Sequence, residues 1–291
     1  MEIRNIISFI KIVELNSFSK AAAELGYSQS TVTMQIKQLE SELQVKLFDR
    51  FGKNIALTED GKKFLHYSNE IVTAAQNAKC ALSHSSEPSG ELAIGVLESV
   101  GATFLPTILN RYHTLFPQVT TVIRIGTLPE LTHLLNTNQV DVIWIFDESV
   151  TNRDWIKVYE REQKIVLISS PNHPLHNRTG IQIQDILSEP FLLTEKDCSY
   201  RIAFEKTISE RNGKLNIFLE IGNTEIIKKF VQSDLGLSLL PLFSVKDELE
   251  RGTLGILNTT DFSLAMKEQI FYHRSKWITP SMKEFLKLIT G

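Results

Sequence analysis

The stretch at residues 28–39, SQSTVTMQIKQL, restricts the possible folds of this chain more than any other segment. Serine is a residue type that accepts hydrogen bonds from the first N–H groups of a helix, so Ser28 is predicted to begin one. Val32, Ile36 and Leu39 follow at the i, i+4, i+7 spacing of one helix face. The opposite face carries small hydroxyls, amides and the cation Lys37. Such a face suits the major groove of DNA, because hydroxyls and amides pair with base edges and lysine neutralises phosphate.

The neighbouring segments predict the rest of a helix-turn-helix domain. Apolar residues over 3–13 indicate a first amphipathic helix, and FSKAAAELG at 18–26 indicates a short second one that ends at Gly26 in left-handed geometry. A helix, a turn that contains glycine and a second helix form the arrangement whose second helix enters the groove. Farther along, residues 50–54 predict a hairpin, or wing, whose cations Arg50 and Lys53 would reach the DNA backbone or minor groove.

A long helix is predicted to follow this domain. Thr58 is a capping residue, and Glu59 and Asp60 favour the positive end of a helix dipole. No proline occurs before about residue 85, so the helix would be on the order of 40 Å long. One stripe of this helix has the 4-3 spacing of a coiled-coil seam. It consists of Phe64, Ser68, Ile71, Ala75, Ala78 and Leu82. The stripe predicts a dimer with two reading heads, and the alternative that it packs on its own domain stays open.

The bulk composition excludes some classes of protein. A length of 291 residues suggests two or three domains. The net charge is −3, and residues 1–87 carry ten basic and ten acidic side chains, so DNA binding would depend on where the cations lie. No run of about 18 apolar residues predicts a membrane span, and the N-terminus does not resemble a signal peptide. We therefore expect a cytoplasmic protein in which Cys80 and Cys198 are free thiols.

The remaining two-thirds of the chain predicts an α/β domain. Residues 87–90 contain proline and glycine and are expected to form a hinge. Strands are predicted at 92–97, 119–125 and 140–146, with helices at 104–116 and 128–135, which is the order of a parallel sheet covered by helices. The pattern restarts with strands at 164–169, 191–194, 217–221, 237–241 and 268–272 and with helices at 200–212, 224–233, 244–250 and from Pro280. This order predicts two lobes, with the chain crossing between them near residues 160 and 264.

Polar residues after several of these strands predict a ligand site. In such sheets ligands bind beyond the carboxyl ends of the strands, against helix N-termini. The candidate residues are Ser99, Val100, Gly126, Thr127, Thr194, Cys198, Ser199, Tyr200, Arg201, Gly222, Asn223 and Thr224. Their hydroxyls, free N–H groups and one arginine favour a small organic anion, in particular a carboxylate. Taken one at a time, such residues are also typical helix caps.

Two local patterns raise other chemistries. Cys198 could be a nucleophile, but no histidine or acid can be placed beside it from the sequence. His173 and His176 have the spacing of metal ligands, but a third ligand is missing nearby. No phosphate-binding glycine loop is present either. Taken together, these patterns predict no metal, no cofactor and no catalysis. The competing hypothesis is a solute-binding or enzymatic α/β module with an incidental N-terminal helical domain.

The run AAAELGYSQSTVTMQIKQLESELQVKLFDRFGKNIALTEDG resembles the DNA-binding domain of the LysR-type transcriptional regulators. The pattern is matched at Ala21, Ala22, Leu25, Ser28, Gln29, Val32, Ile36, Leu39, Glu40, Leu43, Leu47, Phe48, Arg50, Leu57, Thr58 and Gly61. Thr33 stands where the family usually has serine, which keeps the hydroxyl. Met34 stands where arginine is common, so the DNA register and target sequence are less transferable from the family.

The resemblance implies an N-terminal all-α winged helix-turn-helix with a long linker helix, followed by a two-lobed, periplasmic-binding-protein-like α/β effector domain. The expected boundaries are 1–58, 59–88 and 89–291, with lobe I at 89–161 and 266–291 and lobe II at 162–265. DNA contacts are expected from Ser28, Gln29, Ser30, Thr31, Thr33, Gln35, Lys37, Arg50 and Lys53. The resemblance also implies a ligand-responsive regulator that forms dimers and tetramers, with promoter DNA, a small-molecule effector and RNA polymerase as partners and no membrane.

Overall fold

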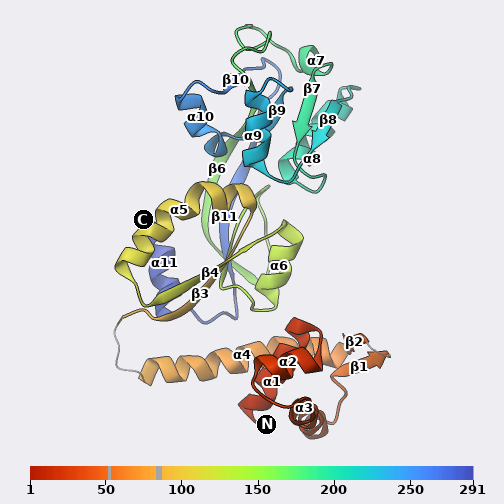
Figure 1. Cartoon of the computed structure of the whole chain (residues 1–291), viewed down its shortest axis with the longest axis vertical. Helices are drawn as coiled ribbons and strands as arrows, with labels where there is room; N and C mark the ends of the chain where they lie inside the picture. Colours follow the sequence, from red (N-terminus) through yellow and green to blue (C-terminus); the bar gives the residue numbers. More distant parts are fainter. Residues whose placement is uncertain (52–53, 83–86, 291) are drawn as a thin grey trace. The chain divides into compact units, whose positions relative to one another are not determined.

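The computed structural model describes residues 1–51, 54–82 and 87–290. The chain separates into two compact units (Figure 1). The first comprises residues 1–88 together with 136–139 and 275–280, and the second comprises residues 89–135, 140–274 and 281–291. Within the described part of the chain, we find no helix that combines the length and the apolar character needed to cross a membrane.

The first unit has the predicted helix-turn-helix order. Its elements are α1 (Ile3–Leu15), α2 (Phe18–Glu24), α3 (Gln29–Leu43), β1 (Phe48–Phe51), β2 (Asn54–Leu57) and α4 (Glu59–Leu82). The turn before α3 forms as its residues predict. Gly26 has a φ of +68°, and the Ser28 Oγ accepts a hydrogen bond from the Thr31 amide at 3.1 Å. Strands β1 and β2 pair antiparallel, from Phe48 opposite Leu57 to Phe51 opposite Asn54, which is the predicted wing.

The core of this unit gathers the apolar faces of its helices. Val32, Ile36 and Leu39 of α3 are buried, as their spacing predicts. Phe9 of α1 is completely buried, and its ring centroid lies 5.2 Å from that of Phe48 and 5.1 Å from that of Phe64. The wing and the start of α4 are therefore packed against the same aromatic cluster that supports α3.

The first half of the predicted seam on α4 packs within its own domain. The helix begins as predicted, because the Thr58 Oγ1 accepts a hydrogen bond from the Gly61 amide at 2.9 Å. Phe64 and Ile71 pack against the helix-turn-helix core, and Ser68 is buried. The alternative of packing on the same domain is thus correct for Phe64 and Ile71. Ala75 is half-buried and Ala78 is exposed, whereas the side chain of Leu82 lies outside the described residues.

Part of the second unit is the predicted parallel sheet. Strand β3 (Gly90–Val96) pairs parallel with both β4 (Val119–Ile125) and β5 (Val142–Asp147). Helices α5 (Glu98–Leu115) and α11 (Pro280–Thr290) pack on one face of these strands, and α6 (Leu128–Asn136) packs on the other (Figure 1).

Helix α5 begins six residues before the predicted position of 104. Ser99 and Gly101 have low helix propensity, so the sequence does not predict a helix over the first turns of α5. Packing overrides that propensity. A Cβ at residue 101 would lie 2.9 Å from a methyl group of Val96, so glycine lets α5 pack closely against β3.

Two long strands connect the lobes of this unit. Strands β6 (Trp155–Ser169) and β11 (Leu264–His273) pair antiparallel, from Ile165 opposite Leu264 to Trp155 opposite His273 (Figure 1). The sequence predicted only part of each strand, at 164–169 and 268–272. Residues 160–162 in the missed part of β6 are all charged and exposed, and backbone pairing in a long ribbon tolerates such side chains because they point to solvent.

The second lobe is built around the outer half of this ribbon. Strands β9 (Ser238–Pro241) and β10 (Gly255–Leu257) pair antiparallel with β6, and β7 (Pro190–Leu193) pairs parallel with β8 (Asn216–Glu220). Its helices are α7 (Ile183–Ile186), α8 (Ser199–Glu210), α9 (Thr224–Gln232), α10 (Lys246–Glu250) and the short 3₁₀ helix Leu242–Ser244. Helix α7 and strand β10 were not predicted from the sequence, and both are too short to produce a periodic signal.

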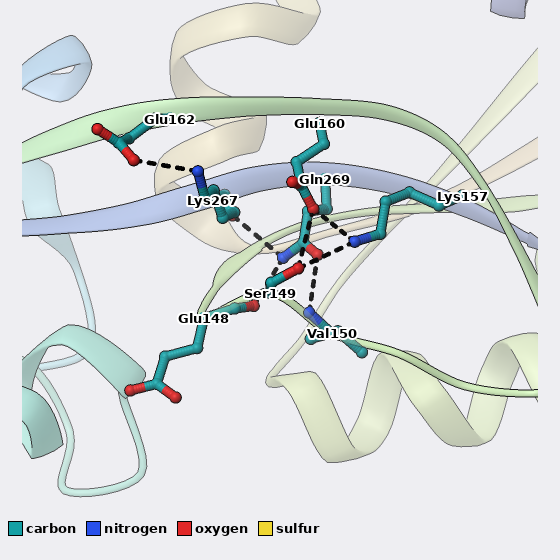
Figure 2. A network of polar contacts seen from close by, with 8 residues as sticks. All are labelled: Glu148, Ser149, Val150, Lys157, Glu160, Glu162, Lys267 and Gln269. Carbon is teal, nitrogen blue, oxygen red and sulfur yellow. Dashed lines mark hydrogen bonds and ion pairs between the residues drawn. The ribbon is translucent and has the colours of Figure 1, made fainter.

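A polar network fastens the loop after β5 to the long strands (Figure 2). Gln269 on β11 is completely buried. Its side-chain amide donates to the Glu148 carbonyl at 2.8 Å and accepts from the Val150 amide at 2.8 Å. Between those residues, the Ser149 hydroxyl donates to the Glu160 carboxylate at 3.1 Å. The network therefore holds this loop at the point where the chain first passes between the lobes.

A buried carboxyl group lies next to this network on β11. Glu268 is 2 % exposed and accepts hydrogen bonds from the Trp144 indole at 3.1 Å and the Gln163 amide at 2.6 Å. Burial raises the pKa of Glu268 above the ordinary value of 4.5, although these hydrogen bonds oppose the shift.

The pKa of Glu268 predicts a specific pH dependence of stability. Because its folded-state pKa is raised, the folded protein binds this proton more tightly than the unfolded chain. The free energy of unfolding should therefore fall as pH rises from about 4.5 through the folded pKa.

Glu268→Gln is expected to remove this decline and to be at least as stable as the unchanged protein at neutral pH. Urea unfolding between pH 4.5 and 8 measures the difference. Glu210→Gln, at an exposed site, is the control, and a Glu268→Gln curve parallel to that of the parent protein would contradict the prediction.

Candidate functional sites

Helix α3 presents a polar surface opposite its buried face. Gln29, Ser30 and Lys37 are exposed, and Thr31 and Thr33 are half-buried. The hydroxyls gather at the start of the helix, where the Ser28 Oγ lies 2.7 Å from the Ser30 Oγ and 2.8 Å from the Thr31 Oγ1. Met34 is 65 % exposed on the same surface. The hydroxyl and amide groups on this surface are of the kind that pair with base edges in the major groove.

Three of the predicted DNA contacts are not among the exposed side chains that the structure describes on α3. Gln35 is 7 % exposed, and its Oε1 accepts a hydrogen bond from the Ser8 hydroxyl at 2.6 Å. Gln35, which the family resemblance offered as a DNA contact, therefore links α3 to α1 and is buried, because position 35 adjoins the buried positions 32, 36 and 39. The side chain of Arg50 and the whole of Lys53 lie outside the described residues.

A cavity of about 250 Å³ lies between the two lobes of the second unit. It is lined by nine of the residues predicted for the ligand site: Ser99, Gly126, Thr127, Thr194, Cys198, Ser199, Tyr200, Gly222 and Thr224. They come from the starts of α5, α6, α8 and α9 and from the segments just before these helices. The strand ends and helix starts that sequence alone pointed to are thus brought together around one space.

Eight further residues line the cavity that the sequence did not single out: Leu97, Glu98, Ile125, Leu128, Glu130, Phe146, Glu195 and Asp197. Most of them are sequence neighbours of predicted residues, and this closeness in sequence could have indicated that they line the same cavity. Four of the eight are acids, although the predicted residues favour an anionic ligand. Glu98 also joins the lobes directly, since its Oε2 accepts from the Thr224 hydroxyl at 2.8 Å.

Three predicted residues do not line the cavity. Val100 is completely buried in the core, and the Asn223 side chain caps α9 by accepting from the Ile226 amide at 2.9 Å. Arg201 is 2 % exposed, and its guanidinium donates to Glu205 at 2.7 Å, to Glu220 at 2.9 Å and to the Thr194 carbonyl. Arg201 therefore does not face the cavity as the sequence predicted, because its donors hold α8 against β8 and against the segment that follows β7.

The site does not provide a reactive thiol. Cys198 is a free thiol, and its burial raises its pKa, although hydrogen bonds from the backbone amides of Tyr200 and Arg201 oppose that shift. Burial also raises the pKa of the neighbouring Tyr200 well above its ordinary value. Cys198 therefore stays protonated at neutral pH, whereas nucleophilic cysteines need an accessible thiolate. The side chain of Cys80 lies outside the described residues.

The two histidines with metal-like spacing have structural contacts instead. The His173 Nδ1 accepts from the Leu175 amide at 3.2 Å, and its Nε2 lies 3.5 Å from the Glu189 carboxylate. The His176 ring packs against Gly255, where a Cβ would lie 1.8 Å from it. In residues 1–51, 54–82 and 87–290, no three histidine, cysteine, aspartate or glutamate side chains are grouped so that they could hold a metal ion.

Comparison with known proteins agrees with both halves of this arrangement. Residues 3–62 match the model of the bacterial regulatory helix-turn-helix proteins of the lysR family, and residues 85–291 match that of the LysR substrate binding domain. An uncharacterized HTH-type transcriptional regulator from Bacillus subtilis, YwqM, is 34 % identical, with 99 % of this chain and 98 % of that protein covered. The chain therefore belongs to the LysR family of transcriptional regulators, with an N-terminal DNA-binding domain and a C-terminal effector-binding domain.

Solved structures show the same fold. A full-length OxyR variant from Pseudomonas aeruginosa matches with a TM-score of 0.77 at 21 % identity, over 99 % of this chain and 94 % of that one. The regulatory domain of CcmR from Synechocystis PCC6803, in complex with 2-PG, matches with a TM-score of 0.61 at 21 % identity, over 69 % of this chain and 96 % of that one. At these identities the likeness establishes the fold alone.

Proposed function

We propose that this protein regulates transcription by binding promoter DNA through α3, in response to a small molecule held in the cavity between the lobes of its C-terminal domain. The observation that carries the proposal is the capped, polar and exposed face of α3, supported from behind by a buried apolar face. The cavity supports the second half of the proposal, since a structurally similar regulatory domain holds the small molecule 2-PG. These features favour a regulator over an enzyme, and we expect it in the cytoplasm with its DNA target.

The DNA contacts that we propose are a reduced set. Ser28, Gln29, Ser30, Thr31, Thr33 and Lys37 remain from α3, and Arg50 and Lys53 remain from the wing. The hydroxyls and the Gln29 amide would contact base edges, and the lysines and Arg50 would contact phosphates. Met34 stands within this surface and supplies apolar contact, for example to a thymine methyl group, in place of a charge.

We also propose that the protein acts as a dimer through the later part of α4, and that two dimers associate as a tetramer. Phe64 and Ile71 in the earlier part of that helix already pack on their own domain, whereas Ala75 is half-buried and Ala78 is exposed, so these two positions can meet a partner. A dimer would present two copies of α3 to a two-fold related site. Ligand in the cavity would change the relative placement of these copies, and RNA polymerase would be the downstream partner.

Lys37→Ala tests the DNA-binding surface. We expect weaker binding to an operator duplex obtained by selection from random-sequence DNA, because one phosphate contact per subunit is lost. The slope of log affinity against log salt should become shallower by about 0.9 for each lost contact. Fluorescence anisotropy of the full-length protein over a salt series measures both effects.

The matched control for this experiment is Lys206→Ala, which removes the same charge from the exposed surface of α8. It should leave affinity and salt slope unchanged. Equal effects of the two substitutions would show that net charge, and not the α3 surface, governs binding. Failure to select any sequence-preferring duplex would instead favour the competing hypothesis of a solute-binding module.

A further inference from the structure

The cavity between the lobes is lined by acidic side chains without basic counterparts. Glu98, Glu130, Glu195 and Asp197 contribute to it, and none of the lining residues is lysine, arginine or histidine. Two nearby cations do not change this balance. Lys196 is exposed and does not line the cavity, and Arg201 is already paired with Glu205 and Glu220.

Two of these carboxylates occupy the places that an anionic ligand would take. The Glu130 Oε2 accepts from the Thr127 amide at 2.8 Å and hydroxyl at 3.1 Å, at the start of α6. The Glu98 Oε2 accepts from the Thr224 hydroxyl at 2.8 Å and amide at 3.4 Å, at the start of α9. Helix N-termini attract anions, so the chain has filled both positions with its own negative charge.

Two of the carboxylates in the cavity wall lie against glycines, where any larger residue would displace them. A Cβ at residue 222 would lie 1.6 Å from the Glu195 Oε1, and one at residue 126 would lie 2.9 Å from the Glu130 Oε2. The Glu195 carboxylate therefore rests directly against the backbone of Gly222, on the cavity side. Glu195 and Asp197 are exposed to solvent, and their carboxylates have no hydrogen bond or ion pair with any other residue in the described part of the chain.

A buried hydroxyl group in the same cavity wall lacks a hydrogen-bond partner in the part of the chain that the structure describes. Thr194 is 4 % exposed and lines the cavity, and its Oγ1 has no hydrogen-bond partner among the described residues. The Cys198 thiol and the Tyr200 hydroxyl lie beside Thr194, but neither makes a hydrogen bond of normal geometry with its Oγ1. Buried hydroxyls are normally hydrogen-bonded, so an unsatisfied one in a cavity wall indicates a missing ligand group.

We propose that the molecule bound in this cavity carries an ammonium group, which donates hydrogen bonds to the carboxylates of Glu195 and Asp197 and to the Thr194 hydroxyl. The proposal rests on the proposed function, in which the cavity holds the effector. An ammonium group has three donors and no acceptor, which matches a wall of acceptors. The remaining carbon chain would pack against Phe146 and Leu128, which line the same cavity. An anion of equal size would be desolvated among like charges, which disfavours it.

Three four-carbon probes test the class of ligand. Isothermal titration calorimetry of the full-length protein compares 1,4-diaminobutane, 4-aminobutanoate and succinate, which differ in charge but share their length. We expect 1,4-diaminobutane to bind most tightly, 4-aminobutanoate less tightly and succinate least. Glu195→Gln should weaken the binding of 1,4-diaminobutane about tenfold, the effect of losing one charge-assisted hydrogen bond.

Glu210→Gln is the matched control, because it removes the same charge from the same lobe at an exposed position that does not line the cavity. It should leave the affinity unchanged. The proposal is overturned if succinate binds more tightly than the ammonium probes, if neither ammonium probe binds, or if Glu195→Gln binds 1,4-diaminobutane as the parent protein does. Binding of the selected duplex by the same preparation reports separately on the regulator function. Intact DNA binding without ammonium binding would refute the ligand class alone.

Discussion

Phe9→Ala should unfold the N-terminal DNA-binding unit while the C-terminal domain stays folded. Phe9 is completely buried and contacts the rings of Phe48 and Phe64, so its removal leaves a cavity where α1, the wing and α4 meet. Such truncations cost about 4 kcal/mol, which is comparable with the total stability of a small domain. In full-length protein, we expect loss of duplex binding and loss of one thermal unfolding transition.

Met34→Ala is the control for this prediction, because Met34 belongs to the same unit but is 65 % exposed. Its unfolding transition should stay within about 0.5 kcal/mol of that of the parent protein. A Phe9→Ala protein that retains both thermal transitions would show that the aromatic cluster does not hold the domain together.

Arg201→Ala should destabilise the second lobe. The guanidinium is buried and is bound to Glu205 of α8, Glu220 of β8 and the Thr194 carbonyl. Removal of one partner from a buried ion pair costs up to about 5 kcal/mol, and the two glutamates are partly exposed, so we expect a loss of about 3 kcal/mol. Thermal unfolding of the full-length protein, with the transition of the C-terminal domain followed by circular dichroism, measures this loss.

Arg201→Met separates packing from charge in the same experiment. Methionine restores much of the buried volume but leaves the two glutamates without their partner, so its stability should lie between those of the parent protein and Arg201→Ala. An Arg201→Ala protein of unchanged stability that had lost binding of every probe would instead identify Arg201 as a ligand contact.

The DNA-binding half of the molecule could be predicted because its signals are local. A cap at Ser28, a glycine turn at Gly26 and the spacing of Val32, Ile36 and Leu39 each act within a few residues, and they agree with one another. Gln35 shows where such local signals stop. It lies at the border of the apolar face, and whether such a residue is exposed depends on the neighbouring helix, here through Ser8 of α1.

The long strands β6 and β11 could be predicted only in part. Hydrophobic periodicity marks the strand segments that contact a core, and the middle of β6 carries Glu160, Arg161 and Glu162 instead. That segment is held by backbone pairing with β11, whose partner residues lie more than 100 positions away in sequence. Such pairing leaves no local pattern.

The sequence by itself determined the order of the longer elements, the second helix of the helix-turn-helix and the strand ends that surround the cavity, because caps, periodicity and strand ends are properties of short segments. The tertiary structure alone decided which charges face that cavity. Arg201 is one residue from Tyr200, which lines the cavity, yet its guanidinium is drawn into the lobe by Glu205 and Glu220. Glu195 is exposed at the cavity because Gly222, from a different part of the chain, leaves room for its carboxylate. The sign of charge in a site depends on long-range pairing of ionised groups, and no short segment of sequence contains that information.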